Sequence, residues 1–265
     1  MSDTFVKLLG TRGSIPVSGA EYSIYGGATS CVFVRMCGEA IFLDAGSGLF
    51  AGKACLTPED KRLSILISHP HIDHLLGLTM FAPRFGDVQT DIYGKVRSGL
   101  TIREQLSRLM SLPLWPVSPD SFGADTRYFE PGESFAIGGV EVTTLESNHP
   151  GGSTIYRLSN AEKSVVYCSD YEHTELHSDA LAEFAADCNL LIYDAQFSDE
   201  EYESRKGWGH STWNEGIRTA ERCGAKRLVL FHHAPLRSDS ELSQIEASAG
   251  SGTISFGKCG EEIAL

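Results

Sequence analysis

The sequence predicts one domain, spanning residues 1–265, in which β-strands are followed by helices in both halves of the chain. At 265 residues, with 42% hydrophobic and 22% charged residues, the chain is long enough to bury a good core. Apolar runs with strand-like alternation end in polar turns. Three helix starts carry a hydroxyl residue followed three positions later by an acid. These patterns by themselves indicate an α/β or α+β fold.

The strands are expected in the following order. Residues 5–9 form a first strand that enters the turn at 10–14, and residues 31–36 pair with 40–43 across a turn at 37–39. Further strand-like runs cover residues 63–67, 140–145, 164–168, 191–194 and 226–231. Capping boxes open helices at Thr101, to about residue 112, at Thr212, to about residue 222, and at Ser238.

Net charge, apolar runs and cysteine spacing limit the classes of function that the chain can have. A net charge of −13 disfavours extended nucleic-acid binding, which needs clustered Lys and Arg, and points to a small substrate. The chain shows no secretory signal and no apolar run long enough to cross a membrane, so a cytoplasmic location is expected. Seven scattered cysteines without a CxxC pair indicate reduced thiols and argue against a cysteine-built zinc site. A homodimer is compatible with these features.

The segment from His69 to His74 carries four metal-ligand side chains within six residues, directly after the apolar run 63–67. In an extended segment alternate side chains share a face, so His69 and His71 can hold one ion together. Asp73 and His74 begin the next turn and are placed to hold a second. Imidazole and carboxylate groups suit zinc or another borderline divalent metal. A surface loop with three of the chain's nine histidines by chance is a poor explanation.

This HxHxDH string resembles the signature of the metallo-β-lactamase superfamily. Three further family positions have counterparts at the ends of later strand-like runs: His149, Asp170 and a histidine after residues 226–231. His232 fits the pattern apolar-x-apolar-x-His, and a slip of one residue to His233 is the alternative. The resemblance implies an αββα sandwich with two divalent ions, zinc first and manganese as the alternative. It implies that one ion is held by His69, His71 and His149, the other by Asp73, His74 and His232, with Asp170 bridging them.

A second region resembles the tRNase Z branch of the superfamily. Asp194 ends the run 191–194, and His210 begins a His-Ser-Thr motif. The resemblance implies that Asp194 orients His210, and a carboxylate-held histidine is biased toward the imidazolium form. Such a group can stabilise a phosphoryl transition state or protonate the leaving oxygen. The catalytic residues expected are therefore Asp73, which also orients the nucleophile, Asp194 and His210. The alternative is that His210 belongs only to a helix cap.

The chain departs from known members of that branch in two ways. A tRNase Z carries a basic arm, usually between the third histidine and the bridging aspartate. Here only 20 residues separate His149 from Asp170, and two strands already occupy them. Related phosphodiesterases of phosphonate breakdown carry a cysteine-based zinc that this chain lacks. The turn at residues 10–14 resembles a glycine-containing family loop, with Arg12 and Ser14 as donors to a phosphate.

The sequence therefore predicts a metal-dependent phosphodiesterase acting on a small substrate, such as a cyclic nucleotide or a cyclic ribose phosphate. Two alternatives stay open. A thioesterase or lactonase would use the same ligands against an acyl carbon, and a non-catalytic nucleotide sensor could retain the fold.

Overall fold

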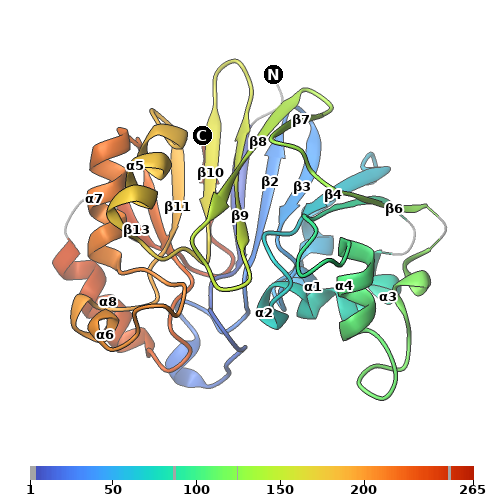
Figure 1. Ribbon diagram of the computed structural model, residues 1–265, viewed down its shortest axis with the longest axis horizontal. Helices are drawn as coiled ribbons and strands as arrows, with labels where there is room; N and C mark the ends of the chain where they lie inside the picture. The colour runs from blue at the N-terminus through green and yellow to red at the C-terminus, as the bar shows by residue number, and fades with distance from the viewer. Residues whose placement is uncertain (1–3, 86–87, 124, 250–251) are drawn as a thin grey trace.

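The computed structural model describes residues 4–85, 88–123, 125–249 and 252–265, and it shows two seven-stranded sheets packed face to face with helices outside (Figure 1). The strands of the first sheet are β1 (Phe5–Gly10), β2 (Cys31–Met36), β3 (Glu39–Leu43), β4 (Arg62–Leu66), β5 (Gln89–Tyr93), β6 (Thr126–Phe129) and β14 (Glu262–Ala264). Those of the second are β7 (Ser134–Ile137), β8 (Val140–Ser147), β9 (Ser153–Ser159), β10 (Ser164–Cys168), β11 (Leu190–Asp194), β12 (Leu228–Phe231) and β13 (Ile254–Phe256). The spatial orders are β14-β1-β2-β3-β4-β5-β6 and β13-β12-β11-β10-β9-β8-β7.

Helices cover the outer face of each sheet (Figure 1). Beside the first sheet lie α1 (Leu49–Gly52), α2 (Ile72–Leu75), α3 (Phe81–Phe85) and α4 (Ile102–Leu109). Beside the second lie α5 (Glu175–Phe184), α6 (Asp199–Glu203), α7 (Trp213–Cys223) and α8 (Asp239–Ala249). The expected αββα sandwich is confirmed. No helix in the described part of the chain is long and apolar enough to cross a membrane.

Three apolar layers cover the faces of the two sheets, so both sheets are buried on each side. This explains why several strands are nearly continuous hydrophobic runs in the sequence. In β2, Val32 and Val34 face the layer between the two sheets, whereas Cys31 and Phe33 face the helices outside the first sheet. This alternation follows from the two-residue period of an extended chain. A third layer lies between the second sheet and helices α5, α7 and α8. Burial on both faces fixes the strand register, and with it the residues at each strand end.

The predicted helix starts are correct. Thr101 and Glu104 form a reciprocal capping box, and Ser238 exchanges the same pair of hydrogen bonds with Glu241. The Thr212 hydroxyl accepts from the backbone N–H of Glu215. Helix α4 ends at Leu109, earlier than predicted, because the backbone at Met110 already leaves the helical region. The twenty residues between His149 and Asp170 are occupied by β9 and β10, as expected.

The topology gathers polar strand ends at one edge of the sandwich. Strands β10, β11 and β12 are parallel neighbours, so their carboxyl ends lie together and deliver Asp170, Asp194 and His232. In the other sheet β3 and β4 are also parallel, and the chain leaving them carries Asp44 and His69. Two sheets therefore contribute to one site, as expected for ligand sites at the carboxyl ends of parallel strands.

Candidate metal centre

The structure brings together all seven side chains that the sequence predicted as metal ligands. One group, whose ligand atoms lie within 4.8 Å of one another, is His69, His71, His149 and Asp170. A second group is Asp73, His74 and His232. The two oxygens of Asp170 face different groups. Its Oδ1 lies 3.0 Å from His74 Nε2, whereas its Oδ2 lies 3.6 Å from His69 Nε2. Asp170 therefore occupies the position of a bridge between the two groups.

Hydrogen bonds at the Nδ1 atoms orient most of the imidazoles. Nδ1 of His74 lies 2.7 Å from Asp44 Oδ2, and Nδ1 of His149 donates to the carbonyl oxygen of Gly209 at 2.9 Å. With Nδ1 as the donor, the lone pair of Nε2 points into the cluster, which is the arrangement of metal-ligating histidines. His71 differs, because its Nδ1 faces the cluster, 3.2 Å from His149 Nε2.

The chemistry of the donor set fits a metal. The Nε2 atoms of His69 and His74 are buried and make no hydrogen bond within the described residues, although carboxylates lie near them. A buried polar atom without a partner is costly, and a bound cation would satisfy it. Oxygen and imidazole ligands at these two positions suit a borderline divalent ion.

The histidine pKa values shift in different directions in the two groups. Burial lowers the pKa of His69, of His71 and of His149, so these imidazoles are neutral near pH 7, as ligation requires. Burial also lowers the pKa of His74, but Asp170, Asp73 and Asp44 raise it far more, to well above its usual value. Three carboxylates around one imidazole favour positive charge there, which a proton on His74 or a divalent ion supplies.

Asp44, which sequence reasoning missed, is the main support of the cluster. It is fully buried and accepts hydrogen bonds from the Ser68 backbone N–H, the Ser68 hydroxyl and the Tyr167 hydroxyl at 2.7–2.8 Å, in addition to facing His74 Nδ1. Ser68 Oγ in turn lies 3.0 Å from His69 Nδ1. One carboxylate therefore positions a histidine of each group. The sequence feature that could have identified Asp44 is its position directly after the apolar run 40–43.

His232 and His233 face opposite ways. Nε2 of His232 lies 3.1 Å from Asp170 and 3.2 Å from Asp73, while its Nδ1 lies 2.9 Å from Gln196 Oε1. His233 points away from the cluster, and its Nε2 donates to the carbonyl oxygen of Gly257 at 2.9 Å. The geometry therefore favours the register in which His232 is the ligand.

Asp194 and His210 lie against the same cluster. His210 Nδ1 is 2.8 Å from Asp194 Oδ2, and its ring stacks on His232 with centroids 5.0 Å apart. The backbone N–H of Ser211 reaches Asp194 Oδ1 at 3.3 Å. Helix α7 is capped by Thr212, so the His210 side chain is not required for the cap.

The loop at residues 10–14 supports the site differently from what the sequence predicted. Arg12 is fully buried and donates to the carbonyl oxygens of Gly26, Ala234 and Arg237, so the prediction that it contacts a phosphate is wrong. Ser14 does contribute, through its backbone N–H, which donates to Asp73 Oδ2 at 2.7 Å. Gly13 passes so close to His232 that a Cβ there would lie 2.4 Å from its ring.

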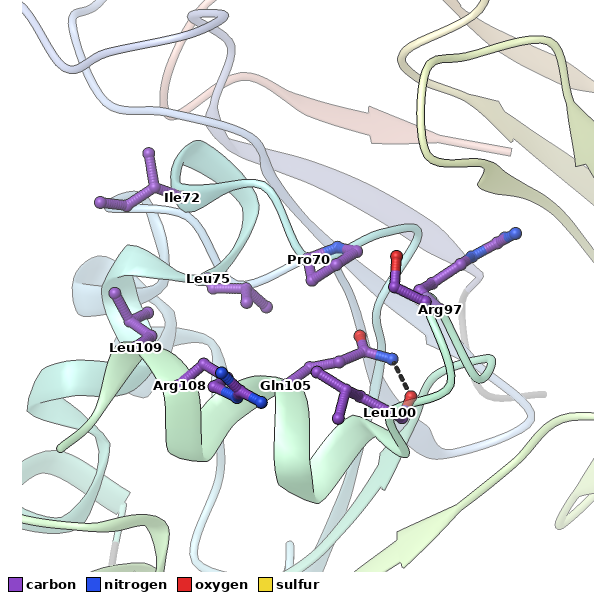
Figure 2. A pocket seen from close by; sticks show the side chains of 9 residues that line it. Pro70, Ile72, Leu75, Arg97, Leu100, Gln105, Arg108 and Leu109 are labelled. Carbon is purple, nitrogen blue, oxygen red and sulfur yellow. Dashed lines mark hydrogen bonds between the residues drawn. The ribbon is translucent and has the colours of Figure 1, made fainter.

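A cavity of 360 Å³ lies between residues of α2 and α4 (Figure 2). Pro70 and Ile72, which flank His71 in the chain, line it from one side, and Gln105, Arg108 and Leu109 of α4 line it from the other. Its volume matches that of a small-molecule site.

Comparison with known proteins identifies the family. The beta-lactamase superfamily domain matches residues 39–233, a span that includes all seven clustered side chains, and the chain belongs to this superfamily. It is 23% identical over 258 residues to the probable metallo-hydrolase YhfI of Bacillus subtilis (96% of this chain, 97% of the relative) and 25% identical over 278 residues to a ribonuclease Z of Halorubrum lacusprofundi (86% and 85%).

Solved structures show the same fold. The crystal structure of YhfI from Bacillus subtilis superposes with a TM-score of 0.72 at 23% identity, covering 98% of both chains. A diphosphatase from the PhnP family superposes with a TM-score of 0.71 at 17% identity, covering 99% of this chain and 97% of its own.

Proposed function

We propose that this protein is a metal-dependent phosphodiesterase that hydrolyses a small phosphodiester, with a cyclic nucleotide or cyclic ribose phosphate as the narrower substrate class. The observation that carries the proposal is the Asp194–His210 pair, joined at 2.8 Å and stacked against the candidate metal ligands. Metal-dependent hydrolysis alone does not require such a pair. Hydrolysis of a phosphodiester gives it two tasks, which are charge stabilisation and proton donation.

The proposed ligands of the first ion are His69, His71 and His149. Those of the second are Asp73, His74 and His232, with Asp170 shared between the two. Divalent ions in such a site, zinc or manganese here, polarise phosphoryl oxygens and lower the pKa of water. Asp73, whose Oδ2 is fixed by the Ser14 N–H, is placed to orient an attacking water.

His210 is suited to act as a cation at neutral pH. Burial lowers the pKa of His210, but the charge and hydrogen bond of Asp194 raise it more, to about 9. The imidazolium Nε2 can stabilise negative charge on the phosphoryl group, or donate its proton to the leaving oxygen as the P–O bond breaks. Asp194 is itself held by the backbone N–H groups of Gln196 and Ser211, so the pair is rigid.

Four further observations support a small phosphorus-containing substrate. The relatives include a ribonuclease Z and a diphosphatase, both named for hydrolysis at phosphorus. The segment between His149 and Asp170 holds two strands and leaves no room for a basic arm. The chain carries a net charge of −13, and the cavity beside His71 has a volume of 360 Å³. A thioesterase or lactonase would use the same ligands but would give His210 no special task.

The test compares metal-loaded protein on bis-(p-nitrophenyl) phosphate with thioester and lactone substrates. His210→Ala should retain its metal and lower diester turnover by roughly 10²–10⁴-fold, the usual range for a positioned acid. Asp194→Asn should have a smaller effect in the same direction, because the histidine remains but loses its charged partner. His177→Ala, at a half-buried histidine outside the cluster, is the control.

Three outcomes would count against the proposal. Faster turnover of acyl substrates would favour the thioesterase or lactonase. An undiminished rate per folded His210→Ala molecule would end the catalytic role of this residue. Stoichiometric binding of a cyclic nucleotide without turnover would favour a sensor, and a screen over cyclic mononucleotides and dinucleotides would reveal it.

A further inference from the structure

We propose that the exposed indole of Trp208, beside a cavity whose walls include the buried Phe197, is a stacking site for an aromatic group, such as a nucleobase, on the leaving-oxygen side of the substrate. The inference rests on the proposed phosphodiesterase function and makes its substrate class more specific. Its starting observation is an exposed aromatic side chain on a fixed loop. Trp208 is 61% exposed, although its neighbours in the chain are held tightly in place.

Glu172 fixes the loop that carries Trp208. Its Oε1 accepts from the backbone N–H of Gly207 at 2.7 Å, and its Oε2 accepts from that of Gly209 at 2.9 Å. The carbonyl oxygen of Gly209 accepts from His149 Nδ1. Gly209 also has a φ of +86°, and a Cβ there would lie 2.2 Å from His149 Nδ1. An exposed indole on a loop fixed on both sides loses little entropy when a ligand binds, which suits it for recognition.

The indole borders a second cavity, of 310 Å³, whose walls include Phe197, Pro235 and Leu236. Leu236 is 85% exposed, and the backbone on either side of it is held by the buried Arg12 through the carbonyl oxygens of Ala234 and Arg237. Trp208 and Leu236 are therefore both presented to solvent by anchored loops. A patch of this kind is typical of a binding site.

This second cavity is lined by residues that contact the candidate centre. Gln196, which lines it, faces His232 Nδ1, and Ser14, which also lines it, donates its N–H to Asp73. The ring of Phe197 meets the ring of His210 edge to face, with centroids 5.8 Å apart. Because His210 is the proposed proton donor, a group bound in the cavity beside Phe197 would lie on the side of the leaving oxygen.

The chemistry of the walls favours a flat π-system. The Arg205 guanidinium lies over the buried Phe197 ring, 5.2 Å from its centroid, so the cavity combines the exposed indole of Trp208 with one delocalised cation. Nucleobases stack on such side chains without needing sequence-specific hydrogen bonds. The cavity of Figure 2 is lined by Pro70 and Ile72, which flank His71 in the chain, and could take the remainder of the substrate.

The experiment uses metal-loaded full-length protein and adenosine as the probe, with binding followed by isothermal titration calorimetry. Trp208→Ala should weaken adenosine binding about tenfold, within the range measured for loss of one stacked base, and Trp208→Phe should retain most of the affinity. With bis-(p-nitrophenyl) phosphate, Trp208→Ala should raise KM about tenfold and leave kcat within about twofold, because Trp208 does not touch the reacting atoms. Leu114→Ala is the matched control, at an apolar residue that is 74% exposed but outside both cavities.

Unchanged adenosine affinity and KM in a folded Trp208→Ala variant would overturn the stacking site. A change in self-association instead, measured by analytical ultracentrifugation, would make this face an interface between two copies and would also overturn it. Adenosine binding that depends on Trp208 in a protein that hydrolyses no diester would leave the stacking site standing and reject the proposed function.

Discussion

Replacing Asp44 with Asn tests how much of the metal affinity depends on a residue that touches no metal. Four donor groups converge on the Asp44 carboxylate, three of them on Oδ2 and one, the Ser68 backbone N–H, on Oδ1. An asparagine offers one acceptor oxygen. With that oxygen at the Oδ2 position, its NH₂ group faces the Ser68 N–H. One buried hydrogen bond is then lost and two donors are opposed, at a cost of about 1–3 kcal/mol of folding stability.

Metal binding should weaken as well. His74 loses the charged partner that fixes its ring and keeps Nε2 directed into the cluster. Removing such a support typically lowers metal affinity by about 10–100-fold, which corresponds to roughly 1.4–2.7 kcal/mol. Competition with a chromogenic chelator measures the affinity, and a melting curve measures the stability in parallel.

The matched control is Asp91→Asn. Asp91, on β5, is as fully buried as Asp44, but it pairs with Arg62 of β4 and Arg127 of β6, outside the cluster. This variant should lose stability and keep the metal affinity of the wild type. A folded Asp44→Asn protein with unchanged metal affinity would refute the reasoning, because the charge and orientation supplied by Asp44 would then be dispensable.

Three further predictions concern the cluster and its neighbour. Asp170→Ala should lose activity and most of the bound metal, since its two oxygens face the two groups. Elemental analysis that finds two ions in a fully active variant would show that Asp170 is not a bridge. His232→Ala should lose one ion while His233→Ala retains both, and the reverse pattern would move the assignment by one residue. Burial depresses the pKa of His233 to about 3, so between pH ~6.5 and ~3 the unfolded chain binds a proton that the folded chain excludes. The stability that His233 contributes is therefore complete above pH ~6.5 and falls by up to about 1.4 kcal/mol per pH unit on acidification. His233→Gln should flatten this slope in urea unfolding at matched metal content, and equal slopes would contradict the assignment.

The order of the site residues could be predicted from the sequence because each follows a recognisable strand. The apolar runs 63–67, 164–168 and 191–194 are buried in the interior of the sandwich, so their lengths and ends are marked by the first polar residues beyond them. The dense string from His69 to His74 then identifies the chemistry. The capping pairs at Thr101 and Ser238 were readable for the same reason, because both partners lie within one helical turn.

The supporting residues could not be predicted, because their partners are distant in sequence. Asp44 reaches His74 and Tyr167 only after β3 pairs with β4 and the second sheet packs across them. Glu172 likewise reaches Gly207 and Gly209 through tertiary packing. Arg12 was instead predicted to contact a substrate, and it does not. A glycine-flanked arginine in a loop looks available to a substrate, but the folded chain buries it against backbone carbonyl oxygens.

The sequence by itself determined an α/β or α+β chain and the polar residues that follow its main strand-like runs, because hydrophobic period and capping are local properties. The sandwich was implied only by the resemblance of the HxHxDH string to a known superfamily. Only the tertiary structure shows which of His232 and His233 points toward the cluster, because the two differ by one position at a single strand end. The left-handed backbone at His232, with a φ of 60°, directs its ring toward Asp170, while His233 packs beside Tyr25 and Phe256. The direction of a side chain at the end of a strand depends on the backbone turn there and on what packs against it, and neither is encoded within a few residues of sequence.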